Sequence, residues 1–236
     1  MAQLVFSGNL LASPLPLVVG VISSAETLRT CAATPPTEAD CDLIEIRLDM
    51  IQLPREELRD AAAALKRPLL FTARHPAEAG QGDLDAAKRL ELLEAHLDQA
   101  ALIDIELRSA LDMQALIRKA QGRGVHVLGS FHDFSSTPSA EILNGAIEMG
   151  IQFRVNAVKL ATTLRTPADL ANLLNLLAAP KRVPLSVMGM GALGRASRIA
   201  LAQSGSLLNY GFLGTANAPG QWPARRLKEI LLETAA

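Results

Sequence analysis

The chain has 236 residues, of which 49% are hydrophobic and only 3% are aromatic. A core that must be built from Ala, Leu, Val and Ile suits an α/β barrel better than an aromatic-rich sandwich, and a chain of this length can form one barrel as a single domain. The formal net charge of −1 excludes a general attraction to nucleic acid or to an anionic membrane surface, so any recognition of an anion must be local.

The cysteines and the apolar stretch in the N-terminal third of the chain bear on its location in the cell. Two cysteines, Cys31 and Cys41, are too few for a disulfide framework and lack the spacing of a metal site, which indicates a reducing cytoplasm and no bound metal. The apolar stretch from Leu10 to Ile22 resembles a signal peptide, but no Lys or Arg precedes Arg29 and two prolines interrupt it. We expect it to cap the bottom of a barrel and lead into the first strand. No run reaches the ~18 apolar residues of a membrane span.

Short apolar runs alternate with segments of helical periodicity along the whole chain. We interpret as strands residues 18–22, 43–47, 69–72, 102–106, 125–130, 157–161, 185–188 and 207–212. The clearest helical segments are residues 84–100, 111–120, 140–149, 168–177 and 222–232, and Pro54, Pro138 and Pro167 mark helix starts. This repeated alternation predicts a parallel sheet closed into a (β/α)₈ TIM barrel, with residues 1–236 as one domain.

Polar side chains end nearly every predicted strand, on the face opposite the aliphatic residues. They are Glu45, Arg47, Arg74, Asp104, Glu106, His132 and Lys159, with Glu78 and Arg198 on the segments that follow strands three and seven. In a barrel of this kind the functional site lies at the C-terminal ends of the strands. Because buried charges must be paired or must hold a ligand, the balanced signs predict a mouth that binds a small anionic, hydroxylated molecule.

Lys159 is the most informative of these residues. It lies in the otherwise apolar run 155–161, and Ala157 and Ala161 share its face of the strand and leave room beside it. Burial lowers the pKa of a lysine, and a neutral amine can form a Schiff base with a carbonyl substrate. An isolated strand lysine more often extends to solvent, so the functional interpretation depends on the rest of the chain.

Six motifs, each at the end of its predicted strand, resemble those of the type I 3-dehydroquinate dehydratase (3-dehydroquinase) family. The resemblance extends from about Leu17 to Gln221. The motifs are Glu45-Ile46-Arg47-Leu48-Asp49, Phe71-Thr72-Ala73-Arg74 with Glu78, Ser130-Phe131-His132-Asp133-Phe134, Val158-Lys159-Leu160-Ala161, Met190-Gly191-x-x-Gly194-x-x-Ser197-Arg198 and Ala218-Pro219-Gly220-Gln221. The resemblance implies a lyase without a cofactor that dehydrates 3-dehydroquinate through a lysine imine, the third step of the shikimate pathway and of aromatic amino acid biosynthesis.

The resemblance also assigns roles. It implies that Lys159 is the Schiff-base residue, that His132 shuttles protons and that Glu78 is an acidic residue of the active site. The residues expected to bind substrate are Glu45, Arg47, Arg74, Arg198, Asn217 and Gln221. A homodimer is expected from the family. The chain departs from the family's pattern at Ala79, where glycine is usual, and at Asn217, where serine is usual.

The chemistry of the residues agrees with these roles. An iminium makes the C–H bond on the neighbouring carbon more acidic. An imidazole can remove that proton and later protonate the departing hydroxyl. We expect Asp104 or Glu106 to orient the imidazole of His132. His75 is the rival base, whereas His96 and His126 are predicted to be structural or surface residues. Arg198 follows a glycine-rich turn and suits a carboxylate, and residues 214–221 are predicted to form a lid.

Two other functions remain open at this point. A class I aldolase would share Lys159 but would not explain the arginines and the glutamine. A non-catalytic binding protein on the same scaffold is expected to lack the lysine or the histidine, and both are present.

Overall fold

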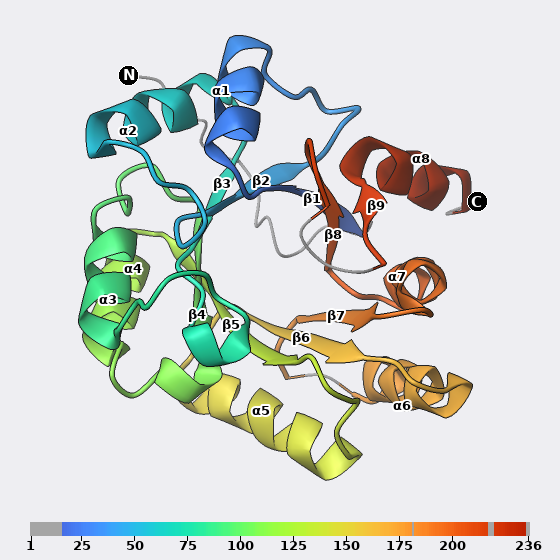
Figure 1. Cartoon of the computed structure of the whole chain (residues 1–236). Coiled ribbons are helices and arrows are strands. Elements are labelled where there is room, and N and C mark those ends of the chain that lie inside the picture. Colours follow the sequence, from blue (N-terminus) through green and yellow to red (C-terminus); the bar gives the residue numbers. More distant parts are fainter. Residues whose placement is uncertain (1–15, 181, 217–219, 235–236) are drawn as a thin grey trace.

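The protein, in a computed structural model that describes residues 16–180, 182–216 and 220–234, forms a ring of parallel strands wrapped by helices (Figure 1). The strands are β1 (Leu17–Ile22), β2 (Leu43–Arg47), β3 (Leu69–Thr72), β4 (Leu102–Glu106), β5 (His126–Asp133), β6 (Ala157–Thr163), β7 (Leu185–Met190), β8 (Leu208–Phe212) and the short β9 (Trp222–Pro223). This is the predicted TIM-barrel architecture. Most of the N-terminal segment expected to cap the barrel, and Asn217, lie outside the described residues.

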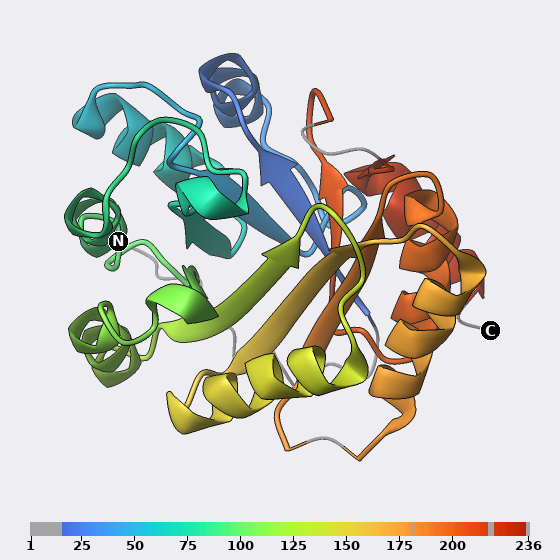
Figure 2. The same ribbon diagram turned by 60° about the horizontal axis from the view of Figure 1, so that its bottom comes forward.

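Helices follow the strands and cover the outside of the ring, which the turned view makes clear (Figure 2). They are α1 (Ala25–Ala33), α2 (Arg55–Ala64), α3 (Ala86–Glu94), α4 (Gln114–Gly122), α5 (Ala140–Gln152), α6 (Pro167–Ala178), α7 (Gly194–Gln203) and α8 (Ala224–Thr234), with 3₁₀ turns η2 (Pro76–Glu78) and η3 (Leu107–Ser109). Several start at side-chain caps that the sequence encodes locally. The side chain of Thr166 accepts from the backbone N–H of Asp169, and that of Asp169 accepts from the N–H of Thr166, a capping box that opens α6.

Residue alternation along the strands separates two cores. In β2, Ile44 and Ile46 belong to the core between strands and helices, whereas Leu43 belongs to the core inside the barrel. The inner core is aliphatic at its floor, where Leu43, Leu70, Leu102, Leu128 and Leu208 meet. Because side chains alternate with a period of two, the next inward positions toward the mouth are Glu45, Thr72, Asp104, Ser130 and Tyr210. The barrel thus changes from apolar to polar one layer above its floor.

The ring is closed differently at one seam. The ladder runs in the order β7-β6-β5-β4-β3-β2-β1-β8-β9, so β7 and β8 share no ladder in the described part of the chain. The start of β7 instead bonds to the segment that enters β8: Leu207 N donates to Leu185 O (2.8 Å) and Ser186 Oγ donates to Leu208 O (2.5 Å), and Ser206 bonds to the backbone of Val187.

Most predicted strand positions are confirmed, and the differences lie at element ends. Strand β5 extends to Asp133, beyond the apolar run predicted to end at residue 130, so His132 pairs with Ala161 of β6 inside the sheet. The helix predicted from residue 84 to 100 ends at Glu94 and continues as turns. The helix predicted to begin at Trp222 begins at Ala224, because Trp222 and Pro223 pair with β8 as a parallel strand.

Candidate active site

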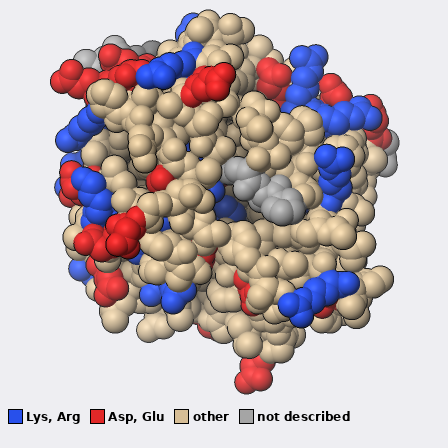
Figure 3. Space-filling model, viewed as in Figure 1, with Lys and Arg blue, Asp and Glu red and all other residues tan. Residues whose placement is uncertain are grey.

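The C-terminal ends of the strands surround a cavity of about 580 Å³ that is open to solvent. Viewed down the barrel, the surface is hollowed near its middle, with Lys or Arg atoms at the floor of the hollow (Figure 3). All of the predicted site residues that the structure describes line this cavity: Glu45, Arg47, Arg74, Glu78, His132, Lys159, Arg198 and Gln221. Residues far apart in the sequence are thus brought together as predicted.

Lys159 projects from β6 into the floor of this cavity. Its side chain is only 5% exposed, and Nζ lies 3.5 Å from Oδ2 of Asp104 and 4.0 Å from Oε1 of Glu45. Burial lowers the pKa of Lys159, and it outweighs the opposing effect of the two carboxylates. The amine is therefore easier to deprotonate than a surface lysine, while both carboxylates remain close enough to stabilise a positive nitrogen.

Asp104 and Glu106 hold Arg74, which is a correction to the expectation that one of them orients His132. Arg74 donates from Nη2 to Oδ2 of Asp104 (2.9 Å) and from Nη1 to Oε1 of Glu106 (2.8 Å). Nη1 also contacts Oγ of Ser130 (2.7 Å), which donates to Oδ1 of Asp104 (2.5 Å). Arg74 lies two residues after β3, beside β4, and its long side chain reaches both carboxylates.

Arg89 extends this network from outside the barrel and was missed by sequence reasoning. It lies on α3, is 1% exposed, and donates to Oε2 of Glu106 (2.5 Å) and to Oγ of Ser109 (2.9 Å). Glu106 thus bridges two guanidiniums, Arg74 and Arg89. A helical arginine at a position otherwise suited to an aliphatic residue is the only signal that the sequence offered.

His132 is oriented by Glu78. Nδ1 of His132 lies 2.8 Å from Oε2 of Glu78, and both side chains are buried. Burial raises the pKa of Glu78 to about 7. Burial, together with the positive charges of Arg74 and Lys159, holds the pKa of His132 well below its usual value. The raised pKa of Glu78 and the lowered pKa of His132 favour one proton shared between Oε2 of Glu78 and Nδ1 of His132. Nε2 of the neutral imidazole then remains available as a base.

The turn that presents Glu78 has an unusual backbone. Ala79 adopts the left-handed conformation (φ 60°, ψ 29°) where glycine is usual in the resembling family. A non-glycine residue there costs roughly 1–2 kcal/mol. Gly80 is required, because a Cβ at this position would lie 2.1 Å from the carbonyl oxygen of Arg74. The close approach links the Glu78 turn to the end of β3.

The other histidines lie away from the cavity. Nδ1 of His75, the rival base, accepts from the backbone N–H of Ala77 and so caps η2. His96 is buried and stacks on Phe71, with ring centroids 4.9 Å apart. His126 opens β5 at the opposite end of the barrel from the cavity. His132 is therefore the histidine that faces Lys159.

The two residues on β2 that are predicted to bind substrate have different partners. Glu45 is buried and accepts from Oγ1 of Thr72 (2.7 Å). Arg47 forms a two-bond ion pair with Asp49, whose oxygens also accept from the backbone N–H groups of Arg74 and Gln81. Asp49 thereby fixes the loop after β3 to the end of β2, and Arg47 remains partly exposed at the rim.

Arg198 and Tyr210 form the opposite wall. Arg198 is 2% exposed, and no carboxylate lies within 4.0 Å of it among the described residues. Nη1 donates to the carbonyl oxygen of Tyr210 (2.6 Å), and Nε has no hydrogen-bond partner among the residues that the structure describes. Burial lowers the pKa of Arg198 to about 10. The ring of Tyr210 lies with its centroid 4.0 Å from Nζ of Lys159. Sequence reasoning missed Tyr210, although its alternation with Leu208 and Phe212 on one strand face could have indicated it.

Gln221 is held beside α7 by contacts of its neighbours. Nε1 of Trp222 donates to the carbonyl oxygen of Arg195 (3.1 Å), and the guanidinium of Arg195 lies 5.0 Å from the Trp222 ring centroid. Gly220 has φ 77° and packs against Gly194. The predicted lid at 214–221 is described only in part, because residues 217–219, which include Asn217, lie outside the described residues.

The described residues contain neither a metal-binding cluster nor a membrane-spanning helix. No group of three or more His, Cys, Asp or Glu side chains there is arranged to hold a metal ion. No helix in the described ranges combines the length and apolar character needed to cross a bilayer.

The sequence matches the model of the type I 3-dehydroquinase family over residues 19–234. It is 35% identical over 207 residues to a 3-dehydroquinate dehydratase of Latilactobacillus sakei, covering 83% of this chain and 84% of that protein. A 3-dehydroquinate dehydratase of Bacillus licheniformis is 33% identical over 207 residues, covering 81% of each chain.

Solved structures agree with the sequence matches. The 3-dehydroquinate dehydratase of Geobacillus kaustophilus superposes with a TM-score of 0.82 at 25% identity, covering 95% of this chain and 94% of that one. The enzyme of Enterococcus faecalis superposes with a TM-score of 0.79 at 26% identity, covering 94% and 95%.

Proposed function

The chain belongs to the type I 3-dehydroquinase family, and from this membership we infer that it is a 3-dehydroquinate dehydratase in which Lys159 forms the imine and His132 moves the protons. The reaction converts 3-dehydroquinate to 3-dehydroshikimate and water, a step of the shikimate pathway that leads to the aromatic amino acids. The match over residues 19–234 favours this function over an aldolase and over a non-catalytic binding protein.

One observation carries the assignment of the nucleophile. Lys159 is a buried amine with a lowered pKa, and it lies in the same cavity as an imidazole whose pKa is also lowered. The neutral amine attacks the C3 carbonyl, and loss of water from the adduct leaves an iminium. Asp104 and Glu45, at 3.5 and 4.0 Å from Nζ, stabilise the positive nitrogen, and the burial of the Lys159 side chain strengthens their effect.

His132 then acts on the carbon next to the iminium. The neutral imidazole removes a C2 proton, and the electron pair left on carbon delocalises into an enamine. The enamine expels the C1 hydroxyl, which takes the proton from the imidazolium and leaves as water. Glu78, 2.8 Å from Nδ1, stabilises the imidazolium between these two transfers. Hydrolysis of the product imine regenerates Lys159.

The remaining residues of the cavity bind the substrate in this proposal. Arg198 is a buried guanidinium without a carboxylate partner in the described protein, which supports a bidentate contact with the C1 carboxylate. Gln221 and Asn217 are proposed to assist in binding the substrate. Glu45, Arg47 and Arg74 are proposed to bind the hydroxyls of the substrate.

Borohydride trapping tests the nucleophile directly. Incubation with 3-dehydroquinate and borohydride, followed by peptide mass analysis, should attach the reduced substrate to Lys159. Lys159→Ala should lose both turnover and trapping while the far-UV circular dichroism spectrum stays native. The matched control is Lys88→Ala, which removes a half-exposed lysine on α3 and should retain both. Adduct on a different lysine would refute the assignment.

A histidine exchange tests the base separately from the nucleophile. His132→Ala should still form the trapped imine, because Lys159 remains, but kcat should fall roughly 10²- to 10⁴-fold. His75→Ala is the matched control and should change kcat by less than about threefold, since His75 only caps a 3₁₀ turn. A large loss with His75→Ala and a small one with His132→Ala would reverse the two roles.

The domain organisation, cellular location and oligomeric state of the enzyme are also proposals. We infer one catalytic domain over residues 1–236, a cytoplasmic location and a homodimer. The two free cysteines, one of them buried, support the location. Ile142 and Met149, which are 55% and 39% exposed on α5, support an apolar contact with a second copy. Light scattering should give a dimer, and Ile142→Lys should weaken it if α5 forms the contact.

A further inference from the structure

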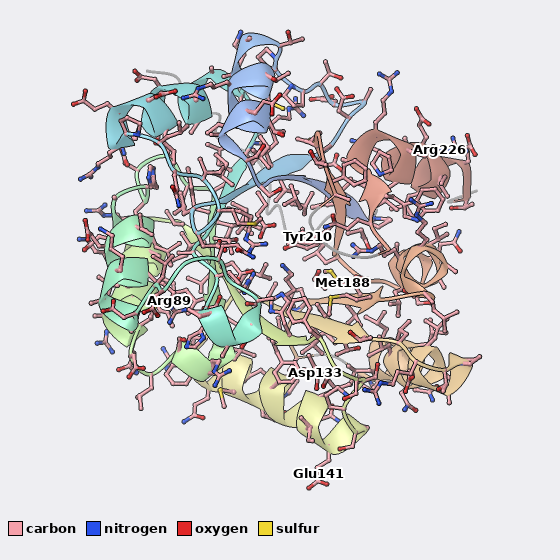
Figure 4. The ribbon with its side chains drawn as sticks, in the orientation of Figure 1. Arg89, Asp133, Glu141, Met188, Tyr210 and Arg226 are labelled. Atoms are coloured by element: carbon pink, nitrogen blue, oxygen red, sulfur yellow. The ribbon has the colours of Figure 1, made fainter. Side chains whose placement is uncertain are left out.

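Tyr210 has a buried hydroxyl for which the described protein supplies no partner. It is the only tyrosine of the chain, it is 3% exposed on β8, and it lines the same cavity as Lys159. The side-chain view places Tyr210 and Met188 inside the ring of strands, whereas Arg226 and Glu141 lie at the periphery (Figure 4). The Tyr210 hydroxyl makes no hydrogen bond to any described residue. A phenylalanine would fill the same space without a polar atom to satisfy.

The ring of Tyr210 is fixed next to the reacting nitrogen. Its centroid lies 4.0 Å from Nζ of Lys159, a distance at which an aromatic face attracts a cation. Nζ stays attached to Lys159 when the iminium forms, so the ring faces this nitrogen before and after the bond to substrate is made. The nitrogen is cationic in the iminium, and the ring can therefore stabilise it. The substrate carbon bonded to Nζ must therefore lie beside this ring.

The hydroxyl remains a neutral donor in this environment. Burial, together with the negative charges of Glu45 and Asp104, raises the pKa of Tyr210 well above its usual value. A phenol of this kind cannot act as a base at neutral pH, but it can donate one hydrogen bond and accept others. Substrate oxygens are the partners that enter this cavity during the reaction.

We propose that Tyr210 is a further substrate-contacting residue, whose hydroxyl donates a hydrogen bond to the C4 hydroxyl of 3-dehydroquinate while its ring faces the iminium nitrogen. The proposal rests on the proposed function, because it needs C3 bonded to Lys159. C4 is adjacent to C3, so its oxygen is the hydroxyl oxygen nearest the ring. The oxygens on C1 are already assigned to Arg198 and His132.

Tyr210→Phe removes the hydroxyl and keeps the ring. We expect kcat/KM to fall about 10-fold, and borohydride trapping on Lys159 at saturating substrate to persist. Thermal stability should be unchanged or higher, because a buried hydroxyl without a protein partner is removed. An unchanged kcat/KM would overturn the proposal and would mean that the hydroxyl makes no contact with the substrate that affects turnover.

An analogue of 3-dehydroquinate without the C4 hydroxyl tests the partner. The native enzyme should lose kcat/KM on this analogue, and Tyr210→Phe should lose roughly 10-fold less, because the contact is already absent. Additive losses would show that Tyr210 does not contact C4. Failure of the native chain to trap substrate on Lys159 would instead refute the proposed function itself, so the two failures are distinguishable.

A matched hydroxyl deletion separates a structural effect from a kinetic one. Ser206 is buried just before β8, and its Oγ accepts from Val187 N (2.9 Å) and donates to Val187 O (3.0 Å). Ser206→Ala should lower the melting temperature and leave kcat/KM within about twofold of native. Tyr210→Phe should show the reverse pattern. A Tyr210→Phe protein that loses stability as Ser206→Ala does, with native kinetics, would assign the hydroxyl a structural role.

Discussion

The two sides of the barrel mouth treat their charges in opposite ways. On the side of β3, β4 and α3, which we call the paired side, Arg74 and Arg89 bind Asp104 and Glu106 in buried ion pairs. On the side of α7 and β8, the unpaired side, Arg198 has no carboxylate within 4.0 Å among the described residues, and the Tyr210 hydroxyl has no described partner.

The difference indicates which groups are reserved for the ligand. The paired side is satisfied by the protein alone, so it fixes the electrostatic setting of Lys159 before substrate arrives. The unpaired side has buried polar groups without described partners, and burying them is unfavourable in free energy. An anion or a hydroxyl that enters the cavity and bonds to them offsets this cost. The unpaired side thus suits the carboxylated, hydroxylated substrate of the proposed reaction, and Lys159, the proposed imine residue, lies between the two sides.

Arg74→Met should give the largest effect on stability. It leaves Asp104 and Glu106 buried with fewer cations, and removal of one partner from a buried ion pair typically costs about 3–5 kcal/mol. Urea unfolding at neutral pH measures the loss. A loss below about 1 kcal/mol would show that the paired side is not held together by its ion pairs.

Arg198→Met should separate binding from stability. Because the guanidinium has no carboxylate partner in the described protein, unfolding should change by less than about 1 kcal/mol. The value of kcat/KM should fall roughly 10- to 150-fold, the equivalent of about 1.5–3 kcal/mol for a hydrogen bond to a charged group. A protein that loses stability as Arg74→Met does would remove the distinction between the two sides.

The Glu78–His132 pair predicts an acid limb in the pH profile of kcat/KM. The raised pKa of Glu78, about 7, means that the pair gains a proton and loses its base as the pH falls through this value. In Glu78→Gln the limb should move to lower pH, because His132 alone has a lowered pKa. Initial rates between about pH 5 and 9 measure it, and an unchanged limb would assign the titration to another group.

The same pair predicts a stability effect of definite sign. The folded pKa of Glu78 lies above its ordinary value of 4.5, so its contribution to stability is present below pH 4.5 and is lost as the pH rises through about 7. The lowered pKa of His132 acts in the opposite direction, with its contribution lost as the pH falls below 6.5. Glu78→Gln should therefore gain stability relative to the native chain as the pH rises from about 4.5 to 7.

Arg195→Ala should give the smallest effect. It removes an Arg–Trp contact at 5.0 Å beside Gln221, on the unpaired side, and such contacts contribute about 0.5–1 kcal/mol at exposed sites. Thermal unfolding measures it, with Arg225→Ala, an exposed arginine on α8, as the matched control. A fall in kcat/KM of more than about 10-fold would mean that Arg195 positions Gln221 instead of only anchoring Trp222.

Much of the barrel could be predicted from the sequence because strand faces alternate with a period of two. Glu45 and Arg47 both line the cavity as predicted, Asp104 and Glu106 both bind Arg74, and Lys159 lies between Ala157 and Ala161 at the floor of the cavity. Element ends were less predictable. The apolar run of β5 ends before the strand does, since Phe131, His132 and Asp133 continue its pairing with β6.

What the sequence by itself determined was the identity and the face of each polar residue along its own strand. Which of them pair was decided by the tertiary structure. Glu78, not Asp104 or Glu106, reaches His132, and Arg89 enters the network from a helix outside the barrel. Alternation determines direction along one strand, whereas distances across the mouth depend on strand tilt, on closure at β7 and β8, and on long side chains from other elements.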